Sequence, residues 1–123
     1  MTLPIASVPN GTITSPKGFS AGGIFAGIKT PGVDKKDIGL LYSEQACAIA
    51  GTFSQNSIIS PTVTLDRQRV GTDKKIHAVV VNSGCANTAV GDQGMIDAKE
   101  MTDITGAHLG VASEKTIVSS TGV

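Results

Sequence analysis

Residues 78–110 read AVVVNSGCANTAVGDQGMIDAKEMTDITGAHLG, and this stretch decides the fold. It opens with Ala78-Val79-Val80-Val81, a β-branched run without polar alternation, which is typical of a strand covered on both faces. A loop of small residues follows from Asn82 to Gly91. Asp92 then stands where a helix N-cap is expected, and Gly110 suits the C′ position that ends a helix. The stretch therefore predicts a strand, a loop and a helix that runs to about Leu109.

The predicted helix has an apolar side and a solvated side. Lys99 and Asp103 stand four residues apart, a spacing that places them together on the solvated side. The apolar stripe that should face the core consists of Ala98, Met101, Ile104 and Ala107.

Strand signals flank this unit on both sides. Downstream, residues 115–120 read KTIVSS and predict a further strand. Upstream, alternation predicts strands at 18–29, 38–43, 47–53 and 62–65, with a Gly22-Gly23 bulge in the first and a turn at 30–34. Residues 46–50 fit a short helical turn as well, and residues 1–15 form either an arm or a first strand. This order of elements predicts an α/β or α+β fold.

The bulk composition fits one modest globular domain and excludes several classes of protein. Aromatic residues make up only 3% of the 123 residues, so the core must consist mainly of Ile, Val, Leu and Ala, which suits sheets covered by helices. Ten basic residues balance ten acidic ones without a basic stripe, which argues against nucleic acid as a partner. The longest apolar run is far too short to span a bilayer. Two cysteines without framework spacing, and no leader, predict a cytoplasmic protein.

Side chains that suggest chemistry have simpler structural explanations. Cys85 lies in a loop after a strand, where nucleophiles are often displayed, but His77 and His108 are both expected to lie out of its reach. We therefore expect Cys85 and Cys47 to be small buried side chains. The loop after residue 82 matches no phosphate-binding motif, and we expect Asn82 and Asn87 to hold its turning backbone. No metal-ligand spacing occurs around either histidine.

Thr121-Gly122 is the site we single out. A glycine at a strand end can turn its backbone N–H toward a cleft, and the threonine hydroxyl lies beside it. Two such donors can hold a developing oxyanion, although an ordinary turn explains the pair as well when it is judged by spacing alone. The strand runs into these residues without a closing segment, so we expect residues 1–123 to be a single domain at the N-terminal end of a longer precursor.

Five stretches together resemble the ornithine acetyltransferase family, also called bifunctional glutamate N-acetyltransferases, of arginine biosynthesis. They cover the chain from Ser15 onward and stand in the family's order. The stretches are PKGFSAGG with AGIK (16–23 and 26–29), AGTFSQN (50–56), VVNSG with AN (80–84 and 86–87), GDQG with DA (91–94 and 97–98) and SSTGV (119–123). The residue at Cys85 departs from the polar residue that is usual there.

The resemblance implies an activity and a partner. A precursor of this family cleaves itself into α and β chains, and the new N-terminal threonine of the β chain accepts acetyl from N-acetylornithine and passes it to glutamate. The resemblance assigns the oxyanion hole to Thr121 and Gly122, and it implies a sandwich of sheets covered by helices, as in self-cleaving aminopeptidases. It implies a heterotetramer with the β chain, no cofactor, and acetyl-CoA as a co-substrate of some members.

The same resemblance places the nucleophile and the substrate-binding residues beyond Val123. The 123 residues alone are therefore expected to be inactive. Three other interpretations stay open: a truncated interaction domain without catalysis, a related self-cleaving amidase or aminopeptidase, and a cysteine hydrolase built on Cys85.

Overall fold

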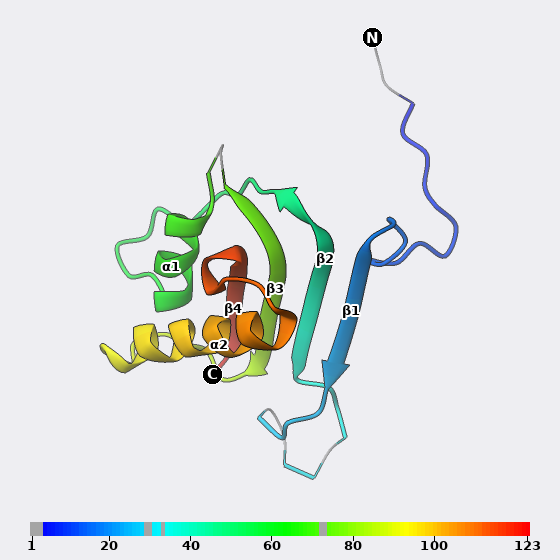
Figure 1. Ribbon diagram of the computed structural model, residues 1–123. Helices are drawn as coiled ribbons and strands as arrows, with labels where there is room; N and C mark the ends of the chain where they lie inside the picture. The colour runs from blue at the N-terminus through cyan, green and yellow to red at the C-terminus, as the bar shows by residue number, and fades with distance from the viewer. Residues whose placement is uncertain (1–3, 29–30, 33, 72–73) are drawn as a thin grey trace.

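The computed structural model describes residues 4–28, 31–32, 34–71 and 74–123. It contains one sheet of four strands, whose order in space follows their order in the chain. The elements are β1 (Phe19–Ile24), β2 (Ile38–Ala48), α1 (Pro61–Arg69), β3 (Lys75–Gly84), α2 (Gln93–Leu109), the 3-10 turn η1 (Ser113–Lys115) and β4 (Thr116–Gly122). The first of the described residues, from Pro4 onward, extend away from the sheet as an arm that leads into β1 (Figure 1). The α/β class is confirmed.

The unit β3–α2–β4 confirms the strand, loop and helix predicted from residues 78–110. The pairs β1–β2 and β2–β3 are antiparallel, whereas β3 and β4 are parallel. A parallel pair needs a long crossover, and α2 supplies it. The helix ends at Gly110, which takes the left-handed φ of 68° that glycine tolerates best. Asp92 precedes the helix but makes no capping hydrogen bond with its side chain, so that part of the prediction is wrong.

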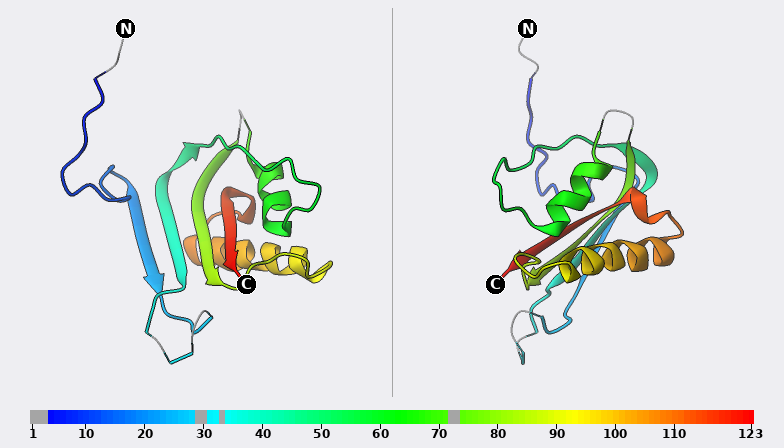
Figure 2. Two further views of the ribbon diagram at one scale, coloured as in Figure 1. Left: turned by 180° about the vertical axis from the view of Figure 1, so that it is seen from behind. Right: turned by 90° about the vertical axis from the view of Figure 1, so that its left-hand side faces the viewer.

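Only one face of β3 is fully covered in this chain, in contrast to the predicted two. Ile76, Ala78 and Val80 are buried, while the intervening Val79 and Val81 are half-buried. The covered face meets α2, which packs across β3 and β4 (Figure 2). The apolar residues on the second face are therefore open to a further layer.

The core lies between this face of the sheet and the two helices. Its buried centre consists of Leu65 from α1, Val80 from β3, Ala98 from α2 and Val118 from β4. Burying each large aliphatic side chain contributes roughly 1.5–3 kcal/mol. One side chain from each of four elements thus holds α1 and α2 to the parallel pair.

The predicted apolar stripe of α2 is only partly correct. Ala98 is fully buried, but Ile104 and Ala107 are exposed, and Thr102 and Thr105 take the buried positions. Their hydroxyls donate to carbonyl groups one turn earlier in the helix, at 2.8 and 2.7 Å, so burial leaves neither hydroxyl without a partner. Lys99 and Asp103 lie on the exposed side as predicted.

The strand predicted at 62–65 is wrong, because these residues belong to α1. Ser60 is the N-cap and its side chain accepts the Val63 N–H at 3.3 Å, and Pro61 stands at the first helical position, where its missing N–H costs nothing. The alternation of Thr62 to Leu65 is therefore incidental. In the helix, Leu65 points into the core.

The first predicted strand ends earlier than expected. β1 stops at Ile24, because the buried Asp37 carboxylate accepts the N–H groups of Ala26 and Ile28 at 2.7 and 2.6 Å and draws this segment out of the sheet. Pro31 and Gly32 form a turn as predicted, while Thr30 and Val33 of that predicted turn lie outside the described residues.

The two strands predicted at 38–43 and 47–53 are largely one strand. They merge into β2, whose register shifts between Tyr42 and Cys47, and residues 49–53 lie outside any strand. The helical turn considered at 46–50 does not form, because β2 continues through Ala48.

Candidate functional site

The carboxyl ends of β3 and β4 meet at one corner of the sheet. In open α/β sheets, ligands bind outside the carboxyl ends of parallel strands. Gly84 ends β3 and pairs with Gly122 at the end of β4, and the loop from Cys85 to Asp92 leads from this corner into α2. The predicted residues Thr121 and Gly122 therefore lie where this rule places a site.

Gly122 is required by the close approach of the two strand ends. Its φ of 136° lies in a region that side chains rarely adopt. A Cβ here would collide with the backbone carbonyl carbon of Gly84 and would stand 2.6 Å from the Cys85 nitrogen. The Ala86 N–H donates to the Val123 carbonyl at 3.1 Å and ties the two ends together one residue further on. No residue other than glycine fits without moving the loop after β3.

The direction of the Gly122 N–H follows from the bonds made earlier in β4. Strand peptide groups alternate in direction, and the Val118 N–H and the Thr116 carbonyl both point away from β3, toward α1. Residues 120 and 122 share this parity, so the Gly122 N–H points outward along the free edge of the sheet. Backbone donors on such an edge are unpaired and available to a ligand.

The Thr121 side chain points in a different direction. The side chains of Thr116 and Val118 are buried on the face that α2 covers, so Thr121, which has the opposite parity, projects from the other face. Thr121 and Gly122 are both exposed. A hydroxyl on the open face and an N–H on the free edge thus meet at one corner. An acceptor placed at that corner can take a hydrogen bond from each.

Two buried charged residues of α1 bind the edge of β4 just before this corner. The Asp66 carboxylate accepts the Val118 N–H at 3.1 Å, and the Arg69 guanidinium donates to the Thr116 carbonyl at 2.8 Å. Burial raises the pKa of Asp66 to about 6, although the Val118 hydrogen bond and the Arg69 charge oppose this rise. Burial also lowers the pKa of Arg69, against the attraction of Asp66. Together the two side chains pair with the outward N–H and carbonyl groups in the first half of β4.

Sequence reasoning missed this pair of charges. The predicted strand at 62–65 stops before Asp66, so it gave no reason to place Asp66 beside Arg69. The signal that reveals them is the Ser60-Pro61 helix start, because in a helix residues three apart share one face.

Cys85 is exposed, so the prediction of a small buried side chain is wrong for it. Cys47 is half-buried, and its thiol lies 3.2 Å from the Ser43 hydroxyl. Both cysteines are free.

The structure does not bring the histidines to Cys85. His77 lies near the start of β3 and contacts the Ser43 carbonyl at 2.9 Å, while Cys85 follows the end of that strand. His108 contacts the Ile104 carbonyl, also at 2.9 Å, in the last turn of α2. Within the described residues no group of three metal-ligating side chains gathers.

The loop after β3 is held by its two asparagines, as predicted. The Asn82 side chain donates to the Cys85 carbonyl at 2.9 Å, and the Asn87 side chain donates to the Gly94 carbonyl at 2.6 Å. The Asn87 Oδ1 is buried without a hydrogen-bond partner and lies against Gly94. The side-chain amides of Asn82 and Asn87 therefore hold the backbone of the loop near its start and at the beginning of α2.

No helix in the described ranges is both long and apolar enough to cross a membrane.

Comparison with known proteins gives consistent matches. The profile of the ArgJ family matches residues 20–123. The Arginine biosynthesis bifunctional protein ArgJ of Dehalococcoides mccartyi is 42% identical over 124 residues, which cover 100% of this chain and 30% of that protein. The protein of the same name from Symbiobacterium thermophilum is 45% identical over 113 residues, which cover 92% of this chain and 28% of that protein. The chain thus spans about 30% of the length of these curated relatives.

Two solved structures share the fold. A crystal structure of Arginine biosynthesis bifunctional protein argJ from Bacillus halodurans superposes with a TM-score of 0.87 at 31% identity, covering 94% of this chain and 59% of that one. The structure of Ornithine Acetyltransferase complexed with Ornithine from Mycobacterium tuberculosis gives 0.82 at 32% identity, covering 90% of this chain and 59% of that one.

Proposed function

This chain belongs to the ArgJ family, and on that premise we propose that it forms the N-terminal part of an acetyltransferase of arginine biosynthesis. The proposed reaction moves acetyl from N-acetylornithine to glutamate, with acetyl-CoA as a second acetyl donor. The names of the relatives support an enzyme of arginine biosynthesis, and one solved relative is an ornithine acetyltransferase bound to ornithine.

The proposed role of this chain is to stabilise the oxyanion. When a nucleophile attacks the acetyl carbonyl carbon, the electrons of the C=O π bond move to oxygen, which becomes negatively charged. The Gly122 N–H and the Thr121 hydroxyl then donate to that oxygen from the free edge and the open face. The observation that carries this proposal is the outward direction of the Gly122 N–H, because a donor already bonded within the sheet cannot serve.

The nucleophile and a β chain are proposed to come from the part of the protein beyond these residues. In that proposal the precursor cleaves itself, and the new N-terminal threonine attacks the acetyl carbonyl carbon of the donor. The α and β chains assemble as a heterotetramer in the cytoplasm. This chain by itself is then inactive. A truncated interaction domain is the alternative, and a related self-cleaving amidase or aminopeptidase is a second one.

The hydroxyl of Thr121 provides the direct test. In the intact protein made from its native gene, Thr121→Val keeps the shape and removes the donor, so we expect kcat to fall about 10²- to 10³-fold. Thr121→Ser keeps the donor and should retain most activity. Ser119→Ala changes the preceding exposed hydroxyl on the same face and serves as the control. Full acetyl transfer by Thr121→Val would remove Thr121 from the oxyanion hole.

An intact-mass spectrum with N-terminal sequencing separates the proposed enzyme from the alternatives. Two chains, one beginning with Thr and the other extending past Val123, would support self-cleavage. A single 12.5 kDa species would favour the interaction domain. Transfer to glutamate, measured against hydrolysis of the same donor, distinguishes an acetyltransferase from an amidase.

A further inference from the structure

A hollow lies at the amino ends of β3 and β4, at the opposite end of these strands from Thr121 and Gly122. Its volume is about 370 Å³, within the range of small-molecule sites, roughly 300–1,000 Å³. Four parts of the chain supply its charged lining: α1, the start of β3, α2 and η1. The charged residues are Arg69, Lys74, Lys75, Lys99, Glu114 and Lys115.

Positive charge is concentrated in this hollow, although the chain as a whole has no net charge. Arg69 is attracted to Asp66, its neighbour on α1, and less strongly to Glu114 and Asp103. With Arg69 and Asp66 counted as a balanced pair, the four lysines against Glu114 leave an excess of three positive charges. The sequence shows no basic stripe, because most of these lysines meet only through the packing of α2 and η1 against β3.

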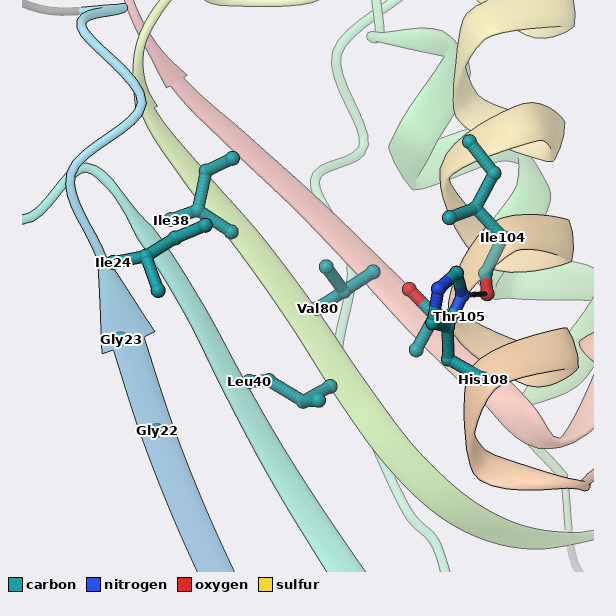
Figure 3. Close-up of a pocket in the computed structure, with 9 residues that line it drawn as sticks. All are labelled: Gly22, Gly23, Ile24, Ile38, Leu40, Val80, Ile104, Thr105 and His108. Atoms are coloured by element: carbon teal, nitrogen blue, oxygen red, sulfur yellow. Dashed lines mark hydrogen bonds between the residues drawn. The ribbon is translucent and has the colours of Figure 1, made fainter.

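The lysine side chains of this hollow do not hold the fold together. Within the described residues, none of the four ammonium groups forms an ion pair or a hydrogen bond. Three of the lysines are exposed, and Lys115 is half-buried. By contrast, the hollow between α2 and the β1–β2 hairpin is lined mainly by apolar side chains (Figure 3). A concavity lined by charges of one sign concentrates ions of the opposite sign, so the basic hollow favours an anion.

We propose that this basic hollow binds a small molecule through a diphosphate group. One phosphate group carries roughly 1.5–2 negative charges near neutral pH, so two of them carry about 3–4, which matches the excess of positive charge. Each lysine ammonium offers three N–H donors that rotate to meet phosphate oxygen atoms, and lysine is a common phosphate ligand. A single carboxylate would leave most of the positive charge unbalanced.

The basic hollow is separate from the corner that carries Thr121 and Gly122. The six steps of β4 from Thr116 to Gly122, at about 3.3 Å each, span about 20 Å. A ligand held by the lysines therefore does not reach an acetyl group at the corner. The proposal rests on the charge and shape of the hollow and does not depend on acetyl transfer.

Equilibrium dialysis of radiolabelled pyrophosphate against the intact protein, made from its native gene, tests the proposal. Lys99→Gln and Lys115→Gln each remove one positive charge from the hollow. Lys35→Gln removes the same charge from the exposed loop before β2 and serves as the matched control. Lys99→Arg keeps the charge at its position. Circular dichroism verifies the fold of each variant, and all measurements are made at one fixed ionic strength because salt screens exposed charges.

We expect saturable binding of pyrophosphate, which Lys99→Gln and Lys115→Gln each weaken about tenfold because each removes a charge-assisted hydrogen bond. Lys35→Gln should bind as the wild-type protein does, and Lys99→Arg should keep most of the affinity. Inorganic phosphate and citrate, added as competitors, should each bind at least about tenfold more weakly than pyrophosphate, because neither presents two linked phosphate groups.

Three outcomes would overturn the proposal. The first is the absence of saturable binding, and the second is an equal loss of affinity in Lys35→Gln and the two hollow variants, which would indicate attraction to the general surface charge. The third is competition by inorganic phosphate or citrate at the same concentration as pyrophosphate. Acetyl transfer plays no part in these readouts, so they are independent of the proposed reaction.

Discussion

The buried carboxylate of Asp66 makes a testable contribution to the pH dependence of stability. Its pKa rises from 3.8 to about 6 in the folded protein, chiefly because burial disfavours the charged form. The folded state therefore holds this proton more tightly than the unfolded state does. The resulting stability is fully present below the unfolded pKa and is lost as the pH rises through about 6.

The size of this effect follows from the two pKa values. One pKa unit corresponds to about 1.4 kcal/mol. Protonating Asp66 by lowering the pH from about 7 to about 5 should therefore add about 1 kcal/mol to the free energy of unfolding. A further decrease to about pH 4 should add about 1 kcal/mol more.

Urea unfolding across this pH range, followed by circular dichroism, measures the effect. Other carboxylates titrate in the same range, so the quantity to compare is the difference between the wild-type chain and Asp66→Asn. Asparagine keeps an acceptor for the Val118 N–H and removes the titration. We expect this difference to favour the wild-type chain progressively as the pH falls from about 7 to about 4. Either of two outcomes would refute the reasoning: a constant difference, which would show that attraction to Arg69 balances burial, or the opposite slope, which would show that it outweighs burial.

Two further predictions concern helix starts. Gly94→Ala should destabilise the fold by about 1–3 kcal/mol, because a Cβ at Gly94 would collide with the Asn87 Oδ1 and lie 2.7 Å from Val90 Cγ2. The control is Gly22→Ala, whose Cβ meets nothing within 4 Å. Equal urea midpoints for the two variants would contradict the clash. Ser60→Ala should lower the stability by about 1 kcal/mol, because it removes the side-chain cap of α1. Thermal unfolding measures this loss, with Ser57→Ala at an exposed position as the control. An unchanged melting temperature would show that Pro61 alone starts the helix.

The β3–α2–β4 unit could be predicted from the sequence because its signals are local. A β-branched run, a loop of small residues and a glycine stop each reflect preferences of a few neighbouring residues. The same holds for Asn82 and Asn87, whose side chains bond to the backbone within a few positions.

The features that could not be predicted depend on partners distant in the chain. Asp66 contacts Val118 across 52 positions, and Asp37 ends β1 by accepting amides that precede it by 9 and 11 positions. The half-burial of Val79 could not be predicted either. The sequence of β3 is apolar on both faces, but only one face is covered by the helices. The exposure of Ile104 also depends on residues distant in the chain, because the part of the sheet beside it belongs to β1 and β2.

The agreement between strand order and chain order has a consequence for how the protein folds. Each strand pairs with the strand nearest to it in sequence, so β1, β2 and β3 can assemble by successive addition of neighbours. Pairings of this kind require the closure of comparatively short loops and favour fast folding. The bonds from Asp66 and Arg69 to β4 span 52 and 47 positions, so they close much longer loops. We therefore expect the corner that carries Thr121 and Gly122 to form later than the antiparallel pairs β1–β2 and β2–β3.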